Sequence, residues 1–289
     1  MTEEKTANAE QIAYWNELSG PKWVALADVI DAQIEPIGNA AIERAAVSTG
    51  ERVLDVGCGC GQTTLELARR VGPAGRVVGI DISKPMLAAA EQRAVQAPAS
   101  MVRFVVADAQ THRFEDETYD LAFSRFGVMF FDSPETAFAN VRRALRPGGR
   151  LVFACWQELG RNPWMAVPGA AVARHVPLPV SANPHAPGPF AFADAERVKG
   201  LVRAGGFVDV SAESLERKLD VGRGLGLEEV VDFLIQLGPA GAALRNAGAP
   251  PDLMSTVRAT LRDVLAPYDT GNGLSMDAAA WIFTARRPE

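Results

Sequence analysis

Val53-Leu54-Asp55-Val56-Gly57-Cys58-Gly59-Cys60-Gly61 joins an apolar segment to a loop that has glycine at every second position. The apolar part, Arg52–Val56, is short and rich in β-branched residues, which predicts a buried strand. Gln62–Val71 follows with apolar side chains at helical spacing and ends before a Gly-Pro pair, which predicts a helix. A strand that enters a helix through a glycine-rich turn predicts a site for a polar or negatively charged ligand. Glycine lets the main chain approach the ligand, and the first amides of the helix face it.

Four further apolar segments follow, with room for helices between them. The predicted strands are Arg52–Val56, Arg76–Ile80, Val102–Val106, Tyr119–Phe123 and Arg150–Ala154, and helices are predicted at Gln62–Val71, after Ser83 and at Pro134–Leu145. The strands are continuous apolar segments rather than alternating ones, which is typical of a parallel sheet covered by helices on both faces. The handedness of such crossovers predicts an α/β fold with a doubly wound, Rossmann-like, mostly parallel sheet. Ligands of these sheets bind at the carboxyl ends of the strands.

The pattern changes after Trp156. Residues 157–192 are rich in proline, glycine and alanine, and a short helix is predicted there at Trp164–His175, followed by a helix at Asp194–Arg203. Two late strands are predicted at Phe207–Leu219 and Met276–Arg286, which would bring the sheet to seven strands. Amphipathic helices are predicted between these strands at Leu227–Leu237 and Asp252–Leu265. A helical excursion between two strands predicts an inserted lid.

Several segments resemble, in order, the motifs of class I S-adenosylmethionine-dependent methyltransferases. They are Val53–Gly61, Gly79–Ser83, Ala107–Ala109, Tyr119–Arg125 and Leu145–Gly149, and the resemblance covers roughly Arg52–Ala154. It implies S-adenosylmethionine as cofactor, S-adenosylhomocysteine as product and no metal. It also implies a division of the chain into an N-terminal helical flap (1–45), a cofactor-binding core (46–156) and a remainder of the sheet (157–289). That remainder carries lid insertions at about 157–192 and 222–272.

Two carboxylates at strand ends have plausible chemical roles in such a cofactor site. Asp81 would accept hydrogen bonds from the ribose hydroxyls, with Ile82 against the adenine face, and Asp108 would accept from the adenine amino group while the Ala109 amide donates to a ring nitrogen. The other interpretations are a helix N-terminal acid for Asp81 and a turn residue for Asp108. The cofactor-binding residues expected are Asp55, Gly57, Cys58, Gly59, Gly61, Gln62, Thr63, Asp81, Ile82, Asp108, Ala109 and Ser124. Cys58 and Cys60 are interpreted as small residues in a crowded loop rather than metal ligands.

The acceptor side is expected after the fourth strand, where aromatic residues gather. Arg125, Phe126, Met129 and Phe130 are the substrate-binding candidates, and simple core packing is the alternative for the aromatic ones. The family's amino-methylating members carry Asn/Asp-Pro-Pro-Tyr here, whereas this chain has Ser124-Arg125-Phe126-Gly127, which argues against DNA adenine or protein glutamine as the substrate. The chain therefore resembles the small-molecule branch, which includes quinone-biosynthesis and natural-product enzymes. The sequence assigns no catalytic residue; the candidates for a base are His112, His175, His185 and Tyr14.

The resemblance implies in-line transfer of a methyl group to an O, C or N atom of a small molecule. The first alternative, an NAD-linked oxidoreductase, is opposed by the glycine spacing. A dinucleotide fingerprint needs glycines at positions one, three and six, but the sixth residue is Gln62 counted from Gly57 and Thr64 counted from Gly59. The second alternative is a non-catalytic S-adenosylmethionine-binding protein. The sequence names neither the acceptor nor an oligomeric state.

Composition narrows the expected partners and compartment. A hydrophobic share of 48 % predicts a sizeable core, and a net charge of −6 argues against a nucleic-acid partner, whose phosphates favour basic surfaces. No uncharged apolar segment approaches the roughly 18 residues that a membrane helix needs, so no membrane is expected. The first residues are polar and lack the features of a targeting signal, and an odd count of three cysteines is typical of reduced thiols. A cytoplasmic location is therefore expected.

Overall fold

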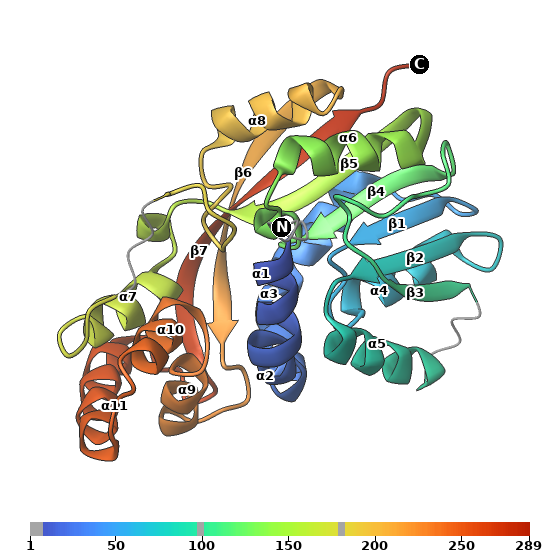
Figure 1. Ribbon diagram of the computed structural model, residues 1–289. Helices are drawn as coiled ribbons and strands as arrows, with labels where there is room; N and C mark the ends of the chain where they lie inside the picture. The colour runs from blue at the N-terminus through green and yellow to red at the C-terminus, as the bar shows by residue number, and fades with distance from the viewer. Residues whose placement is uncertain (1–7, 97–100, 179–182) are drawn as a thin grey trace, which may run out of the picture.

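The computed structural model describes residues 8–96, 101–178 and 183–289 of the chain. Its centre is a seven-stranded sheet with the order β3-β2-β1-β4-β5-β7-β6, flanked by helices (Figure 1). The strands are β1 (Arg52–Val56), β2 (Arg76–Asp81), β3 (Val102–Val106), β4 (Tyr119–Arg125), β5 (Leu145–Trp156), β6 (Val208–Val221) and β7 (Leu274–Arg286). The first five strands run parallel, and β7 runs antiparallel to both β5 and β6. The predicted mostly parallel, doubly wound sheet of seven strands is confirmed.

The helices fall into three groups along the chain. The N-terminal group is α1 (Ala9–Ala13), a π-helix (Tyr14–Leu18), α2 (Ser19–Ala25) and α3 (Ala27–Ala45). The crossover group is α4 (Gln62–Val71), α5 (Lys84–Gln96) and α6 (Pro134–Ala144). The C-terminal group is α7 (Pro163–Val172), α8 (Ala195–Ala204), α9 (Leu227–Leu234), α10 (Gly238–Asn246) and α11 (Pro251–Leu265). In the described part of the chain, none of these helices is both long and apolar enough to cross a bilayer.

The core follows from the apolar strands in the middle of the sheet. Val53, Leu54, Leu121 and Phe123 of β1 and β4 are fully buried, because helices cover both faces of these strands. Helix α4 is capped at its N-terminus by Gly61, whose φ of 84° turns the chain out of the loop, and at its C-terminus by Gly72. The sheet therefore presents the carboxyl ends of β1, β2 and β4 at one edge, as the fold class requires.

Long strands and inserted helices shape the other end of the molecule. Figure 1 shows α7 and α9–α11 gathered beside the far ends of β6 and β7, with α1 and α2 between this group and α5. Helices α9–α11 lie between β6 and β7 in the sequence, where an insertion was predicted. Residues 1–7 of the expected flap and 179–182 of the first expected insertion lie outside the described residues.

The structure differs from the predicted elements in two places. The strand predicted at Arg150–Ala154 begins earlier, because Leu145–Gly149 also belongs to β5, where the register shifts from the pair Tyr119–Leu145 to the pair Leu121–Arg150. The extra residues on β5 form a bulge, which accommodates proline and glycine inside a strand. The predicted helix Leu227–Leu237 ends at Leu234, and a separate helix, α10, follows. Gly238 has a positive φ of 61°, which is not helical, so α9 and α10 cannot form one continuous helix.

Candidate functional site

A cavity of about 570 Å³ lies at the carboxyl ends of β1, β2 and β4. Its walls come from the glycine loop after β1, the segments after β2, β3 and β4, the N-terminal helices, the segment after β5, and helices α9 and α10. One half carries the carboxylates Asp81 and Asp108, and the other half is lined mainly by aromatic and aliphatic side chains. A cavity with a few polar groups in an apolar wall is the usual form of a small-molecule site.

The loops after β1 and β4 touch each other through their main chains. Gly57 has φ of 67°, and a Cβ atom at this position would lie 2.7 Å from the Cα atom of Gly127. A Cβ atom on Gly127 would lie 2.7 Å from the carbonyl oxygen of Val56. Both positions therefore require glycine, because any side chain would push the two loops apart. This contact fixes the polar half of the cavity relative to the apolar half.

Asp81 is held in one orientation at the end of β2. Its Oδ2 accepts a hydrogen bond from the Gly59 amide at 2.9 Å, and its Oδ1 accepts one from the Ser83 amide at 2.8 Å. Burial raises the pKa of Asp81, and these two amides act in the opposite direction. An ionised carboxylate has about four acceptor positions, so capacity is left for two more donors. A fixed carboxylate with two free acceptor positions suits a vicinal diol such as that of ribose.

Asp108 lines the same cavity, and one of its carboxylate oxygens is an unsatisfied acceptor. Its Oδ1 accepts a hydrogen bond from the Gln110 amide at 2.9 Å, whereas its Oδ2 is buried without a partner among the described residues. A buried carboxylate oxygen without a donor is unfavourable, so it indicates a ligand group that donates there. An exocyclic amino group of adenine has that chemistry. The residues at this end therefore fit the adenosine part of S-adenosylmethionine.

Asp55 does not line the cavity but supports the glycine loop after β1 from the protein interior. Its fully buried carboxylate accepts hydrogen bonds from the hydroxyls of Thr63 at 2.8 Å and Thr64 at 2.7 Å, which ties β1 to the start of α4. Burial raises the pKa of Asp55 to about 6, against the lowering effect of the two hydroxyls. Asp55 therefore positions the glycine loop.

The expected cofactor residues divide into two groups. Those that line the cavity are Gly57, Cys58, Gly59, Thr63, Asp81, Ile82, Asp108 and Ala109, and those that do not are Asp55, Gly61, Gln62 and Ser124. The Ser124 hydroxyl accepts from the Gly127 amide at 3.2 Å, so it supports the loop after β4. Burial raises the pKa of the Cys60 thiol to about 12 and that of Cys58 well above its ordinary value. Both thiols are therefore neutral, small groups at neutral pH.

Arg125 already has a carboxylate partner. Its Nη2 donates to Asp31 Oδ1 at 2.8 Å, and Arg93 Nη1 donates to the other oxygen of Asp31 at 2.7 Å. The Gln62 side chain accepts a further hydrogen bond from Arg125. These bonds fasten α3 to α5 and to the end of β4. Arg125 lines the cavity, but its charge is balanced by Asp31, a residue that the sequence did not single out.

The N-terminal helices are fastened over the end of β2. Asn16 Nδ2 donates to the carbonyl oxygen of Ile82 at 2.9 Å, and Asn16 Oδ1 accepts from the Lys84 amide at 3.0 Å. The Ser83 hydroxyl donates to the carbonyl oxygen of Trp15 at 2.8 Å. Asn16 and Trp15 lie in the π-helix, a form that frequently occurs at functional sites. The N-terminal helices therefore contact the segment next to Asp81.

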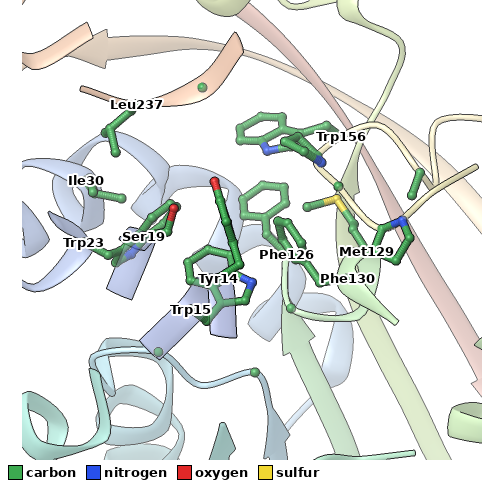
Figure 2. A pocket seen from close by; sticks show the side chains of 18 of the residues that line it. Tyr14, Trp15, Ser19, Trp23, Ile30, Phe126, Met129, Phe130, Trp156 and Leu237 are labelled. Carbon is green, nitrogen blue, oxygen red and sulfur yellow. The ribbon is translucent and has the colours of Figure 1, made fainter. Parts of the chain in front are cut away.

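Aromatic rings form the apolar half of the cavity. Phe126 stacks on Trp156, with ring centroids 4.1 Å apart and an interplanar angle of 12°. The ring centroid of Trp164 lies 5.2 Å from that of Trp156. Figure 2 shows Phe126, Met129, Phe130 and Trp156 along one side of the pocket. Phe126 has φ of 65°, which is strained for a bulky residue and is typical of a constrained functional site. Phe126, Met129 and Phe130 were expected to face the acceptor, whereas Trp156 and Trp164 were missed.

The base candidates lie in different environments. Tyr14 lines the cavity, and Figure 2 shows its hydroxyl directed into the open space between the aromatic wall and Ser19. His112 packs against Phe114, and His175 Nε2 lies 2.8 Å from the Thr260 hydroxyl. Neither of these histidines, nor His185, lines the cavity. Only Tyr14 among the four candidates is therefore placed where it can meet a bound acceptor.

Residues 54–153 match the family model described as a methyltransferase domain. The core of this chain is thus similar to methyltransferase domains. A ubiquinone/menaquinone biosynthesis C-methyltransferase of Ectopseudomonas mendocina is 33 % identical over 164 residues, which are 56 % of this chain and 64 % of the relative. An aklanonic acid methyltransferase of a Streptomyces species is 35 % identical over 118 residues, which are 41 % of this chain and 54 % of the relative. The chain thus spans less than two thirds of the length of these relatives.

Solved structures of other proteins show the same fold as this chain. The Haemonchus contortus phosphoethanolamine N-methyltransferase 2, in complex with phosphomonomethylethanolamine and S-adenosylhomocysteine, has a TM-score of 0.52 and 20 % identity, over 88 % of this chain and 53 % of that chain. The [4+2]-cyclase SpnF has a TM-score of 0.54 and 21 % identity, over 93 % of this chain and 96 % of that chain. At these identities the likeness concerns the fold, and the fold is shared by enzymes of different chemistry.

Proposed function

We propose that this protein transfers a methyl group from S-adenosylmethionine to an O, C or N atom of a small-molecule acceptor. The observation that carries the proposal is the unpartnered Oδ2 of Asp108, which lies in one cavity with the fixed carboxylate of Asp81 and an aromatic wall. Asp81 and Asp108 would hold the adenosine part of the cofactor, and the glycine loop would lie beneath its methionine part. When bound, the cofactor supplies a methyl group on a positively charged sulfur.

The apolar half of the cavity would hold the acceptor in line with that methyl group. Phe126, stacked on Trp156, offers a flat surface for a planar acceptor. Because the positive charge is lost from the sulfur as the methyl group moves, a dry apolar surrounding favours the transfer, and alignment is the main further demand. The Gly57–Gly127 contact keeps the two halves in a fixed relation.

The Tyr14 hydroxyl oxygen would accept a hydrogen bond from the O–H or N–H group of an acceptor that must lose a proton, and would so orient that group. It is the candidate base that lines the cavity, and it lies on the π-helix that Asn16 fastens to the end of β2.

The proposed function divides the chain into three parts. They are the flap (1–45), the cofactor-binding core (46–156) and the remainder (157–289) with lid segments at about 157–192 and 222–272. A small molecule is proposed because the cavity has a volume of about 570 Å³ and a mostly apolar lining.

A thermal-shift comparison of S-adenosylmethionine, S-adenosylhomocysteine and NAD tests the cofactor. A ligand at about 100 times its Kd should stabilise the folded chain by roughly 2.7 kcal/mol. Stabilisation by NAD alone would support an oxidoreductase instead. Transfer of labelled methyl groups to small molecules of a cell extract then tests turnover. Cofactor binding without labelling of any extract component would favour the non-catalytic alternative.

A further inference from the structure

Trp164, which lines the apolar half of the cavity, carries an unpaired hydrogen-bond donor. It lies at the start of α7, and its ring centroid is 5.2 Å from that of Trp156, whose ring stacks on Phe126. Pro168, one helical turn further along α7, also lines the cavity. The Nε1 atom of Trp164 is buried and has no hydrogen-bond partner among the described residues. A buried indole N–H usually has an acceptor, so an unpaired one in a cavity wall indicates a ligand atom that accepts there.

Gln33 of α3 carries the complementary group, an unpaired hydrogen-bond acceptor. Its side chain is only 2 % exposed, and it lines the same cavity. Ile30 and Ile34, which lie on the same face of α3, line the cavity as well, and Figure 2 shows Ile30 across the pocket from Trp156. The Oε1 atom of Gln33 is buried without a hydrogen-bond partner among the described residues. This wall therefore offers a neutral acceptor between two apolar side chains.

Two residues of the same types outside the cavity are satisfied within the protein. Trp281 Nε1 donates to the carbonyl oxygen of Ala193 at 2.8 Å. Gln157 Nε2 donates to the Ser214 hydroxyl at 2.8 Å and to the carbonyl oxygen of Ala280 at 2.9 Å. Neither Trp281 nor Gln157 lines the cavity. The fold thus pairs an indole and a carboxamide away from the cavity and leaves an indole and a carboxamide unpaired in its walls, which is unfavourable for the ligand-free chain.

We propose that Trp164 and Gln33 bind the acceptor through two separate hydrogen bonds. Trp164 Nε1 donates to an oxygen atom of the acceptor, and Gln33 Oε1 accepts from one of its O–H or N–H groups. The acceptor is then a planar molecule with polar groups on a body that lies against Phe126 and Trp156. Such a molecule is favoured over an apolar one of the same shape, because the apolar one leaves both buried atoms unpaired. This inference rests on the proposed function, whose acceptor it describes.

Melting temperatures of the ligand-free full chain test whether the two atoms are unpaired. Trp164→Phe removes the N–H group and keeps an aromatic ring, and Gln33→Met removes the carboxamide and keeps the length of the side chain. The matched controls Trp281→Phe and Gln157→Met make the same changes where the hydrogen bonds are formed. Because Trp164→Phe and Gln33→Met break no hydrogen bond, each should melt about 2 °C or more above its control. Equal melting temperatures within each pair would overturn the proposal.

Equilibrium dialysis of the full chain with S-adenosylhomocysteine tests the binding of polar groups. The probes are 2-naphthol, which donates and accepts, 2-methoxynaphthalene, which only accepts, and 2-methylnaphthalene, which does neither. We expect the wild-type chain to bind 2-naphthol about tenfold or more tightly than 2-methylnaphthalene.

The variants separate the two contacts. Trp164→Phe should abolish the preference for 2-methoxynaphthalene over 2-methylnaphthalene, and Gln33→Met should abolish the preference for 2-naphthol over 2-methoxynaphthalene. The two controls should keep the wild-type order of affinities. Equal affinities for the three probes in the wild-type chain, no binding of any probe, or preferences that survive in the double variant would overturn the proposal. Failure of S-adenosylhomocysteine to bind would instead count against the proposed function, and the ligand-free melting temperatures and dialysis without it would still decide the two contacts.

Discussion

Asp108→Asn changes the hydrogen-bonding character of one buried atom in the cofactor half of the cavity. The Oδ1 atom, which accepts from the Gln110 amide at 2.9 Å, can keep that bond as the amide oxygen. The Oδ2 atom, which has no partner, becomes an NH2 donor of nearly the same size. The free energy of unfolding without ligand should therefore change by less than about 1 kcal/mol, because no existing bond is lost.

Cofactor binding should respond much more strongly. If Oδ2 accepts from the adenine amino group, the substitution removes a hydrogen bond to a charged group and leaves two donors facing each other. The loss is then about 2–4 kcal/mol, or roughly 30- to 1,000-fold in Kd. At a cofactor concentration that stabilises the wild-type chain by about 2.7 kcal/mol, the variant should gain less than about 0.9 kcal/mol.

Thermal unfolding with S-adenosylhomocysteine measures this difference. The wild-type shift of about 5 °C should fall to about 2 °C or less in Asp108→Asn. Asp116→Asn is a matched control, because Asp116 is exposed and pairs with Arg143 instead of facing the cavity. Equal shifts in Asp108→Asn and the wild-type chain would refute the assignment of Asp108 to adenine, and a large loss of stability without ligand would refute the account of its Oδ2 atom.

Three further substitutions test the positions of the loop and its supports. Asp81→Ala should raise the Kd of S-adenosylhomocysteine more than about 100-fold, because two charge-assisted hydrogen bonds to ribose are lost; an unchanged thermal shift would disprove the ribose assignment. The pKa of Asp55 rises from 3.8 to about 6 on folding, so its contribution to stability is present below pH 3.8 and is lost as pH rises through about 6. The free energy of unfolding in urea should thus fall by about 3 kcal/mol over that interval in the wild-type chain and stay flatter in Asp55→Asn; the same slope in both would contradict this. Gly57→Ala should destabilise the chain by about 1–3 kcal/mol in urea, since its Cβ would lie 2.7 Å from Gly127 Cα at a φ of 67°. Gly160→Ala is the control, since nothing lies within 4 Å of its Cβ position, and equal losses would contradict the contact.

The parallel part of the fold could be predicted because its signals are local. The strand Arg52–Val56, its glycine turn and the helix Gln62–Val71 have the same bounds in the structure as in the prediction. Each such unit carries its own apolar segment and its own stop signal, so no distant contact is needed to recognise it. Helix α10 was missed because its first residues, Gly238 and Pro239, are typical of a turn, and packing against α7 and α9 overrides that preference.

The acceptor half of the site could not be predicted in the same way. Trp164 and Trp156 become one wall with Phe126 only when the segment after β5 folds back. Such contacts join segments that are far apart in the sequence, and neither segment alone carries a sequence pattern that predicts the contact. Asp108 could be predicted because the family motif fixes its place at the end of a strand.

The contact between Gly57 and Gly127 has a practical consequence for redesign. Because no side chain stands between the two loops, substitutions cannot adjust their spacing in small steps. Selection for new acceptors therefore has to act on the walls that are free to vary, on α2, α7 and α10. A library that randomises those helices and leaves both glycines untouched would change what the protein recognises without disturbing the geometry of transfer.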